Sequence, residues 1–66
     1  MTFGEALRDA RLKRGYRQED LQRLIGISSK SIGLIENGER HPRYGALVKM
    51  IRLFPELIEK VKEDAK

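Results

Sequence analysis

Residues 18–37 constrain the fold of this chain more than any other segment does. They read QEDLQRLIGISSKSIGLIEN, and residues 18–25 have the apolar spacing of a short amphipathic helix. Gly26 interrupts that spacing, Ile27 follows in the turn, and Ser28 is a typical N-cap for a second short helix. Two short helices joined by so tight a turn form the arrangement with which a domain places one helix in the major groove of DNA.

Further helices are predicted on both sides of this pair. Thr2 and Glu5 have the spacing of a capping box, and Gly15 suits the left-handed position after a first helix that ends at about residue 14. Asn37 and Gly38 both tolerate positive φ and end the third helix. A loop over residues 39–43 leads to a fourth helix, and Pro55 suits the first turn of a fifth.

Apolar positions predict which face of each helix is buried. The inward positions expected in the first four helices are Phe3, Ala6, Leu7 and Ala10; Leu21, Leu24 and Ile25; Ile32 and Ile35; and Tyr44, Leu47, Val48 and Ile51. In the fifth helix Leu57, Ile58 and Val61 lie on one side, and the other side is mostly charged. No segment shows the period-two alternation of a strand. The sequence therefore predicts an all-α fold, a compact bundle of about five short helices in a single domain over residues 1–66, with the fifth helix at about 55–65.

Length and composition exclude several classes of function. A chain of 66 residues can build one modest core but no deep active-site cavity. It contains no cysteine and a single histidine, His41, which has no suitably spaced partners for a metal site. No nucleophile–base pair is evident, so we expect no enzyme, metal or cofactor. With no membrane-spanning run and no signal peptide, a cytoplasmic location is expected.

Charge is distributed unevenly along the chain. The net charge is +4, but residues 1–55 carry +5 while residues 56–66 carry −1. The basic excess therefore accompanies the predicted helix pair and favours a polyanionic partner, although ordinary solubilising charge would give a similar count.

The pattern of particular residues resembles the phage-repressor helix-turn-helix family, the Cro/CI or XRE-like DNA-binding domains. The matching residues are Leu7, Arg11, Gly15, Gln18, Leu21, Gly26-Ile27-Ser28, Ile32, Ile35-Glu36-Asn37-Gly38 and Pro42. The resemblance covers residues 3–54 and implies that the third helix enters the major groove of double-stranded DNA. It also implies two-fold dimers on palindromic operators.

The resemblance also implies roles for individual residues. Ser29, Lys30 and Leu34 would read bases in the groove. The residues implied to contact the DNA backbone are Arg17, Gln18, Ser28, Ser31, Asn37, Arg40 and Arg43. Arg11 and Glu36 would form a structural salt bridge between the first and third helices.

Two positions depart from the family pattern. Gln22 occupies a position that usually holds Ala, where the two helices of the motif pack closest. Its side chain must turn towards solvent or widen the gap, and Gly33 is interpreted as giving it space. Arg17 replaces the usual Ser or Thr cap of the second helix, a loss of ~1 kcal/mol of cap stabilisation.

Several residues allow two interpretations. Lys30 could contact guanine, contact a phosphate or remain solvated, and Leu34 could meet a thymine methyl group or pack in the core. Gly33 could instead allow close approach to DNA. Tyr44 is assigned to the core in preference to base stacking, and Arg40 and Arg43 to phosphate contacts in preference to solvated loop charge.

The fifth helix suggests a partner surface. Its region contributes more large apolar side chains than so small a core can use, and these are Phe54, Leu57, Ile58 and Val61. We expect them to form a homodimer interface; alternatively, the helix folds back and covers them. The function predicted is a transcriptional regulator, most simply a repressor, with no small-molecule ligand evident. The alternative is a protein-interaction module, such as an antitoxin-like partner protein on the same fold.

Overall fold

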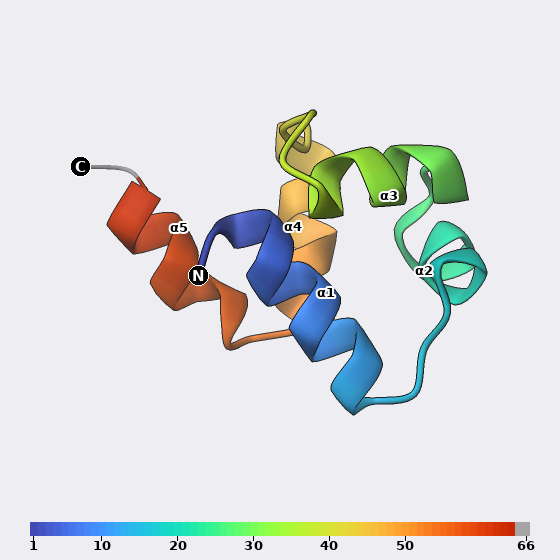
Figure 1. Ribbon diagram of the computed structural model, residues 1–66, viewed down its shortest axis with the longest axis horizontal. Helices are drawn as coiled ribbons and strands as arrows, with labels where there is room; N and C mark the ends of the chain where they lie inside the picture. Colours follow the sequence, from blue (N-terminus) through green and yellow to red (C-terminus); the bar gives the residue numbers. More distant parts are fainter. Residues whose placement is uncertain (65–66) are drawn as a thin grey trace.

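A computed structural model describes residues 1–64 and contains five α-helices (Figure 1). They are α1 (Phe3–Lys13), α2 (Gln18–Ile25), α3 (Ser29–Glu36), α4 (Tyr44–Leu53) and α5 (Leu57–Asp64). The described residues contain no strand, and the predicted all-α fold is confirmed. In Figure 1, α1 lies between α5 on one side and the α2–α3 pair on the other.

The first helix begins and ends as its sequence predicts. The Thr2 hydroxyl accepts a hydrogen bond from the Glu5 N–H at 3.2 Å, and the Glu5 carboxylate accepts one from the Thr2 N–H at 2.8 Å. At the other end Gly15 has a φ of 73°, which lets the chain turn back on α1. The N–H groups of Gly15 and Tyr16 then bond the carbonyls of Leu12 and Arg11, as in a Schellman motif.

The turn between α2 and α3 also follows the sequence prediction. Gly26 ends α2 in the left-handed region with a φ of 86°, a backbone conformation that residues with a Cβ atom rarely adopt. The Ser28 hydroxyl caps α3 by accepting from the Ser31 N–H at 3.1 Å. The third helix ends at the predicted place; of the two residues that tolerate positive φ, only Gly38 adopts it, at 81°, whereas Asn37 has a φ of −83°.

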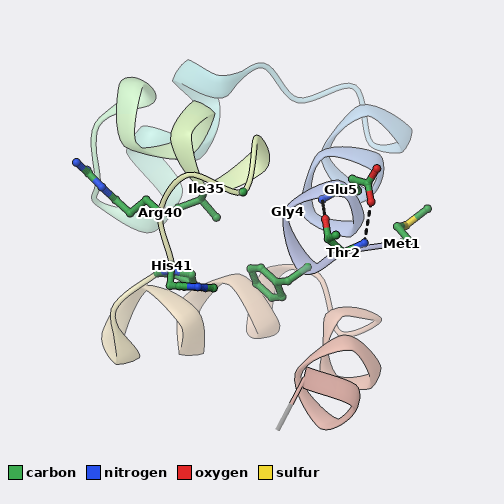
Figure 2. A pocket seen from close by; sticks show the side chains of 10 residues that line it. Met1, Thr2, Gly4, Glu5, Ile35, Arg40 and His41 are labelled. Carbon is green, nitrogen blue, oxygen red and sulfur yellow. Dashed lines mark hydrogen bonds between the residues drawn. The ribbon is translucent and has the colours of Figure 1, made fainter. Parts of the chain in front are cut away.

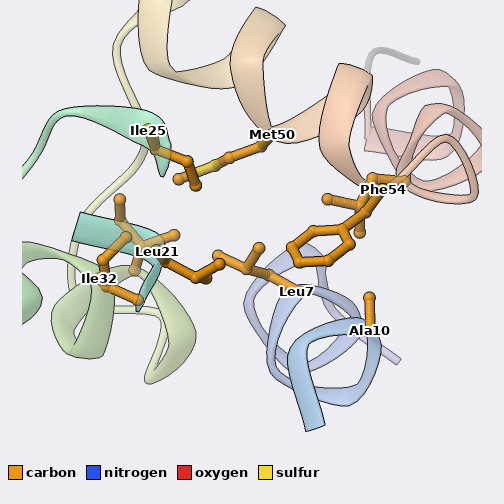
Figure 3. Close-up of a cluster of buried hydrophobic side chains, with 9 residues drawn as sticks. Leu7, Ala10, Leu21, Ile25, Ile32, Met50 and Phe54 are labelled. Carbon is orange, nitrogen blue, oxygen red and sulfur yellow. The ribbon is translucent and has the colours of Figure 1, made fainter. Parts of the chain in front are cut away.

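The core joins all five helices through nine side chains (Figure 3). They are Leu7, Ala10, Leu21, Ile25, Ile32, Ile35, Met50, Phe54 and Leu57. In Figure 3, Leu7 of α1 lies between Leu21 of α2 and Phe54. The α2–α3 pair is therefore packed on the rest of the bundle through its own apolar side.

Two predicted core residues are exposed. Leu24 is 49% exposed because the buried ridge of α2 consists of Leu21 and Ile25, four residues apart. Tyr44 is 82% exposed because α4 turns Met50 inward, followed by Phe54, rather than the predicted stripe. The other members of that stripe, Leu47, Val48 and Ile51, are half-buried.

The fifth helix begins later than predicted and covers more of the core. Phe54 leaves the helical region, with φ −127° and ψ 83°, as expected for a residue that precedes proline. Pro55 consequently lies in a turn, and α5 begins at Leu57. The predicted end at residue 65 lies outside the described residues.

The assignment of Phe54 and Leu57 to a dimer interface is wrong. Both side chains are fully buried, because α5 folds back against α1 and closes the core over them. Ile58 is 38% exposed and Val61 is half-buried. Of the four residues predicted for the interface, these two therefore reach the surface.

Candidate nucleic-acid interface

A buried ion pair holds α3 in place against α1. Arg11 donates from Nε to Glu36 Oε2 at 2.7 Å and from Nη2 to Oε1 at 3.1 Å, and the two side chains are 9% and 2% exposed. Arg11 Nη1 also donates to the Tyr16 carbonyl at 3.0 Å. The pair that the resemblance implied is therefore present, and it also binds the loop between α1 and α2.

The backbones of α1 and α3 also touch directly. Gly4 is buried against the carbonyls of Ile35 and Glu36 at the C-terminal end of α3. A Cβ at residue 4 would overlap the Ile35 carbonyl oxygen and lie 2.7 Å from that of Glu36. Only glycine permits this approach, so the position of α3 depends on a contact that the sequence analysis did not identify.

Gln18 belongs to the same network as the ion pair. Its Nε2 donates to Glu36 Oε1 at 3.2 Å, so the residue is held from inside the domain as well as lying at the start of α2. A Cβ at residue 33 would lie 3.4 Å from Gln18 Nε2. The side chain next to Gly33 is therefore Gln18, at ordinary van der Waals distance, and the interpretation that Gly33 accommodates Gln22 is wrong.

The outer face of α3 is open to solvent. Ile32 and Ile35 are buried on its inner side. Lys30 is exposed on the other side, and Ser29, Ser31 and Leu34 are half-buried. No described helix covers Lys30, so the face that would enter a groove is available.

The loop after α3 adds a basic edge to this face. Arg40 Nη1 donates to Ser31 Oγ at 2.9 Å, and Ser31 Oγ also accepts from Ser28 Oγ at 3.0 Å. Asn37, Arg40 and Arg43 are all exposed. Three residues that were predicted to contact the DNA backbone, Ser28, Ser31 and Arg40, are thus joined by consecutive hydrogen bonds.

Two shallow grooves border the same loop. One, of about 430 Å³, lies between α3 and the loop; it is lined by Ile27, Ser31, Ile35, Arg40, His41, Pro42, Arg43 and Ala46. The other, of about 480 Å³, opens towards the N-terminus of α1, with the Thr2–Glu5 capping box on one wall and His41 on the opposite one (Figure 2). Both open beside the basic loop rather than into the core.

Arg17, the N-cap residue of α2, contacts Asp20 in the first turn of that helix. Asp20 Oδ2 accepts from the Arg17 N–H at 2.8 Å and lies 3.7 Å from Arg17 Nε, while Oδ1 accepts from Arg23 at 2.8 Å. The backbone hydrogen bond from Arg17, and then the side-chain bond from Arg23, lower the pKa of Asp20. Asp20 thus supplies the N3 half of a capping box, while Arg17 makes no side-chain cap hydrogen bond.

Tyr44 is a candidate DNA contact, although the sequence pattern assigned it to the core. It is the first residue of α4, directly after Arg43, and its ring is largely in solvent. Tyr44 thus follows directly on the loop that carries Arg40 and Arg43, and a phenol can donate to a phosphate. The signal was its place next to the basic loop, which the apolar spacing of α4 outweighed.

Among the side chains that the structure describes, no three from His, Cys, Asp or Glu gather closely enough to hold a metal ion. None of the described helices has the length and apolar character needed to cross a membrane.

Two helices packed across a glycine turn, the second with a buried back and a basic open front, define a helix-turn-helix DNA-binding domain. A family model for helix-turn-helix domains, HTH_3, matches residues 7–59. The chain therefore belongs to this family of XRE-type, Cro/CI-like DNA-binding regulators. Comparisons with curated proteins and with solved structures found no match.

Proposed function

We propose that this regulator is a repressor that binds a palindromic operator as a homodimer, with one α3 in the major groove of each half-site. The open face of α3 is the single observation that carries the proposal. Ile32 and Ile35 fix the helix from behind, and Lys30 extends from the front without a covering element. A two-fold dimer on B-DNA would place its two copies of α3 about 34 Å apart.

The proposed division of labour follows the positions of the side chains. Ser29, Lys30 and Leu34 read base edges, since all three lie on or beside the open face of α3. The phosphate contacts are proposed for Arg17, Gln18, Ser28, Ser31, Asn37, Arg40 and Arg43, with Tyr44 added. These contacts border α3 on the side of α2 and on the side of the loop, as the two strands of DNA border the groove.

The proposed dimer surface consists of the apolar side chains of α5 that remain at the surface of the protomer. Ile58 and Val61 lie on this surface, whereas Phe54 and Leu57 are part of the core. The residual apolar area of one protomer is small, so we expect a dimer that forms mainly on the operator.

Selection of duplexes from a random pool by the purified protein tests the proposal. The expected result is an enriched inverted repeat whose half-site centres are about 10 base pairs apart. An enriched single half-site would contradict the dimer, and failure to enrich any sequence would contradict the operator and favour a protein-interaction module. Retention on random duplex at low salt, followed by elution at higher salt, measures the non-specific component separately.

A further inference from the structure

Gln22 links α2 to the first residue of α3. It lies exposed in the middle of α2, and its Oε1 accepts a hydrogen bond from the Ser29 N–H at 3.0 Å. The bond spans the turn between the two helices and joins residues seven positions apart. Since only an acceptor can face the Ser29 N–H, the Gln22 amide nitrogen points away from it.

This bond satisfies a backbone N–H group at the N-terminus of α3. The first N–H groups of a helix have no partner within the helix. The Ser28 hydroxyl accepts from the Ser31 N–H, and Gln22 accepts from the Ser29 N–H. The hydrogen bond to Ser28 is local to the start of α3. The hydrogen bond to Gln22 reaches α2 and therefore fixes the position of α3 relative to α2.

Gln18 holds the opposite end of the same helix. Gln18 and Gln22 are four residues apart and thus share one face of α2. Gln18 donates to Glu36, the last residue of α3, and Gln22 accepts from Ser29, the first. A helix of eight residues, about 12 Å long, is therefore held at both ends by two glutamines of its neighbour.

We infer that Gln22 is a positioning residue that fixes the orientation of α3 and thereby the sequence preference of the domain. The inference rests on the proposed function, because it concerns how α3 meets base edges. Ser29 and Lys30 begin α3, so a pivot about the end held by Gln18 displaces these two most. Contacts from long loop arginines to phosphates tolerate the same displacement, since they depend less on direction.

Two variants remove the acceptor and one retains it. Gln22→Met keeps the length of the side chain without an acceptor, and Gln22→Ala serves as a second variant of high helix propensity. Gln22→Glu keeps an acceptor at the same reach. Leu24→Met is the matched control, because Leu24 is exposed on α2 and makes no bond to α3.

The measurements use the duplex that the wild-type protein selects from a random pool and a scrambled duplex of equal composition. With Gln22→Met and Gln22→Ala, we expect the ratio of the two affinities to fall roughly 5- to 10-fold, the range a single lost hydrogen bond supports. Gln22→Glu lowers both affinities through its added negative charge but keeps the ratio, and Leu24→Met changes neither. Hydrogen exchange of the Ser29 amide should accelerate in the Met and Ala variants and not in the Glu variant.

The outcomes separate this inference from the proposed function. If the wild-type ratio persists in the Met and Ala variants although Ser29 exchanges faster, the link is only structural and the inference is overturned. Unchanged exchange at Ser29 would overturn it earlier, by showing that the hydrogen bond does not form. A wild-type protein that selects no duplex would overturn the proposed function, and the inference with it.

Discussion

Arg11 and Glu36 form a bidentate ion pair, with contacts of 2.7 and 3.1 Å, between two helices that share no other charged contact in the described residues. Replacing Arg11 with Met would leave the Glu36 carboxylate buried with Gln18 as its remaining partner. We expect a loss of about 3–5 kcal/mol in the free energy of unfolding. For a domain of this size such a loss leaves much of the protein unfolded at 25 °C.

Urea denaturation followed by circular dichroism measures this loss. Lys13→Met is the control, because Lys13 pairs with Asp9 at the surface of the same helix and should change stability by less than ~1 kcal/mol. If Arg11→Met unfolds at the same urea concentration as Lys13→Met, the ion pair does not hold α3.

Substitution by alanine should change the stability of the domain in opposite directions at Gly4 and at Gly45. Gly4→Ala places a Cβ against the Ile35 and Glu36 carbonyls, so α1 must move away from α3. We expect it to cost about 2 kcal/mol or more, in the range of other overpacked core positions. Gly45 lies in the first turn of α4 with open space at its Cβ position, and Gly45→Ala should stabilise by about 0.5–1 kcal/mol.

Thermal unfolding of both alanine variants gives the comparison. The expected order of melting temperatures is Gly45→Ala, wild type, Gly4→Ala. Equal melting temperatures for wild type and Gly4→Ala would show that α1 and α3 are not in the close contact described.

Lys30 and Arg43 are predicted to differ in what they contribute to DNA binding. Lys30→Ala should cost about 1–3 kcal/mol on the selected duplex and relax the preference at one base position. Arg43→Ala should weaken binding to all duplexes alike, because a phosphate contact carries no base information. Lys62→Ala, an exposed charge on α5, is the control and should have little effect.

Fluorescence anisotropy with the selected and the scrambled duplex measures both effects. Equal losses on the two duplexes for Lys30→Ala would remove Lys30 from the base-reading residues and place it among the phosphate contacts.

The acid sensitivity of the domain should depend on Glu56. Arg14 donates to its two carboxylate oxygens at 2.7 and 3.0 Å, and this side-chain hydrogen bonding lowers the pKa of Glu56. A carboxylate whose pKa is lower in the folded state stabilises above its unfolded pKa of about 4.3, and the stabilisation is lost as the pH falls towards the folded pKa. Stability should therefore decline below about pH 4.3.

Glu56→Gln should make the acid limb of the stability curve shallower. The measurement is the urea midpoint between pH 3 and pH 7, with Glu59→Gln as the control that removes an equal charge from α5. Identical pH dependence in wild type and Glu56→Gln would mean that the pair with Arg14 contributes nothing in solution.

Helix boundaries could be read from the sequence because local chemistry sets them. The Thr2–Glu5 box, the left-handed Gly26 and the Ser28 cap each act within four residues, and the structure contains all three. The family pattern supplied the Arg11–Glu36 pair, which no local rule predicts. These features were sufficient for the fold and for the position of α3.

The buried face of α4 could not be predicted in the same way. Apolar residues occur almost all around this helix, so two stripes compete, one headed by Tyr44 and one containing Met50 and Phe54. The choice depends on where α1 and α5 pack, which is tertiary information. The contacts of Gly4 and Gln22 depend on the approach of α3 to α1 and α2, and were missed for the same reason.

The salt dependence of binding tests the proposed dimer. If each protomer neutralises three or four phosphates, the slope of log K against log salt concentration should be about −5 to −7 for a dimer. Ile58→Glu places a charge on the exposed apolar side chain of α5, so we expect binding as separate protomers with a slope of about half that value. Lys62→Gln changes the net charge by the same amount on the same helix and should keep the dimer slope. Sedimentation of the protein–duplex complexes gives the stoichiometry independently, and two protomers on the operator with Ile58→Glu would show that this part of α5 is not the interface.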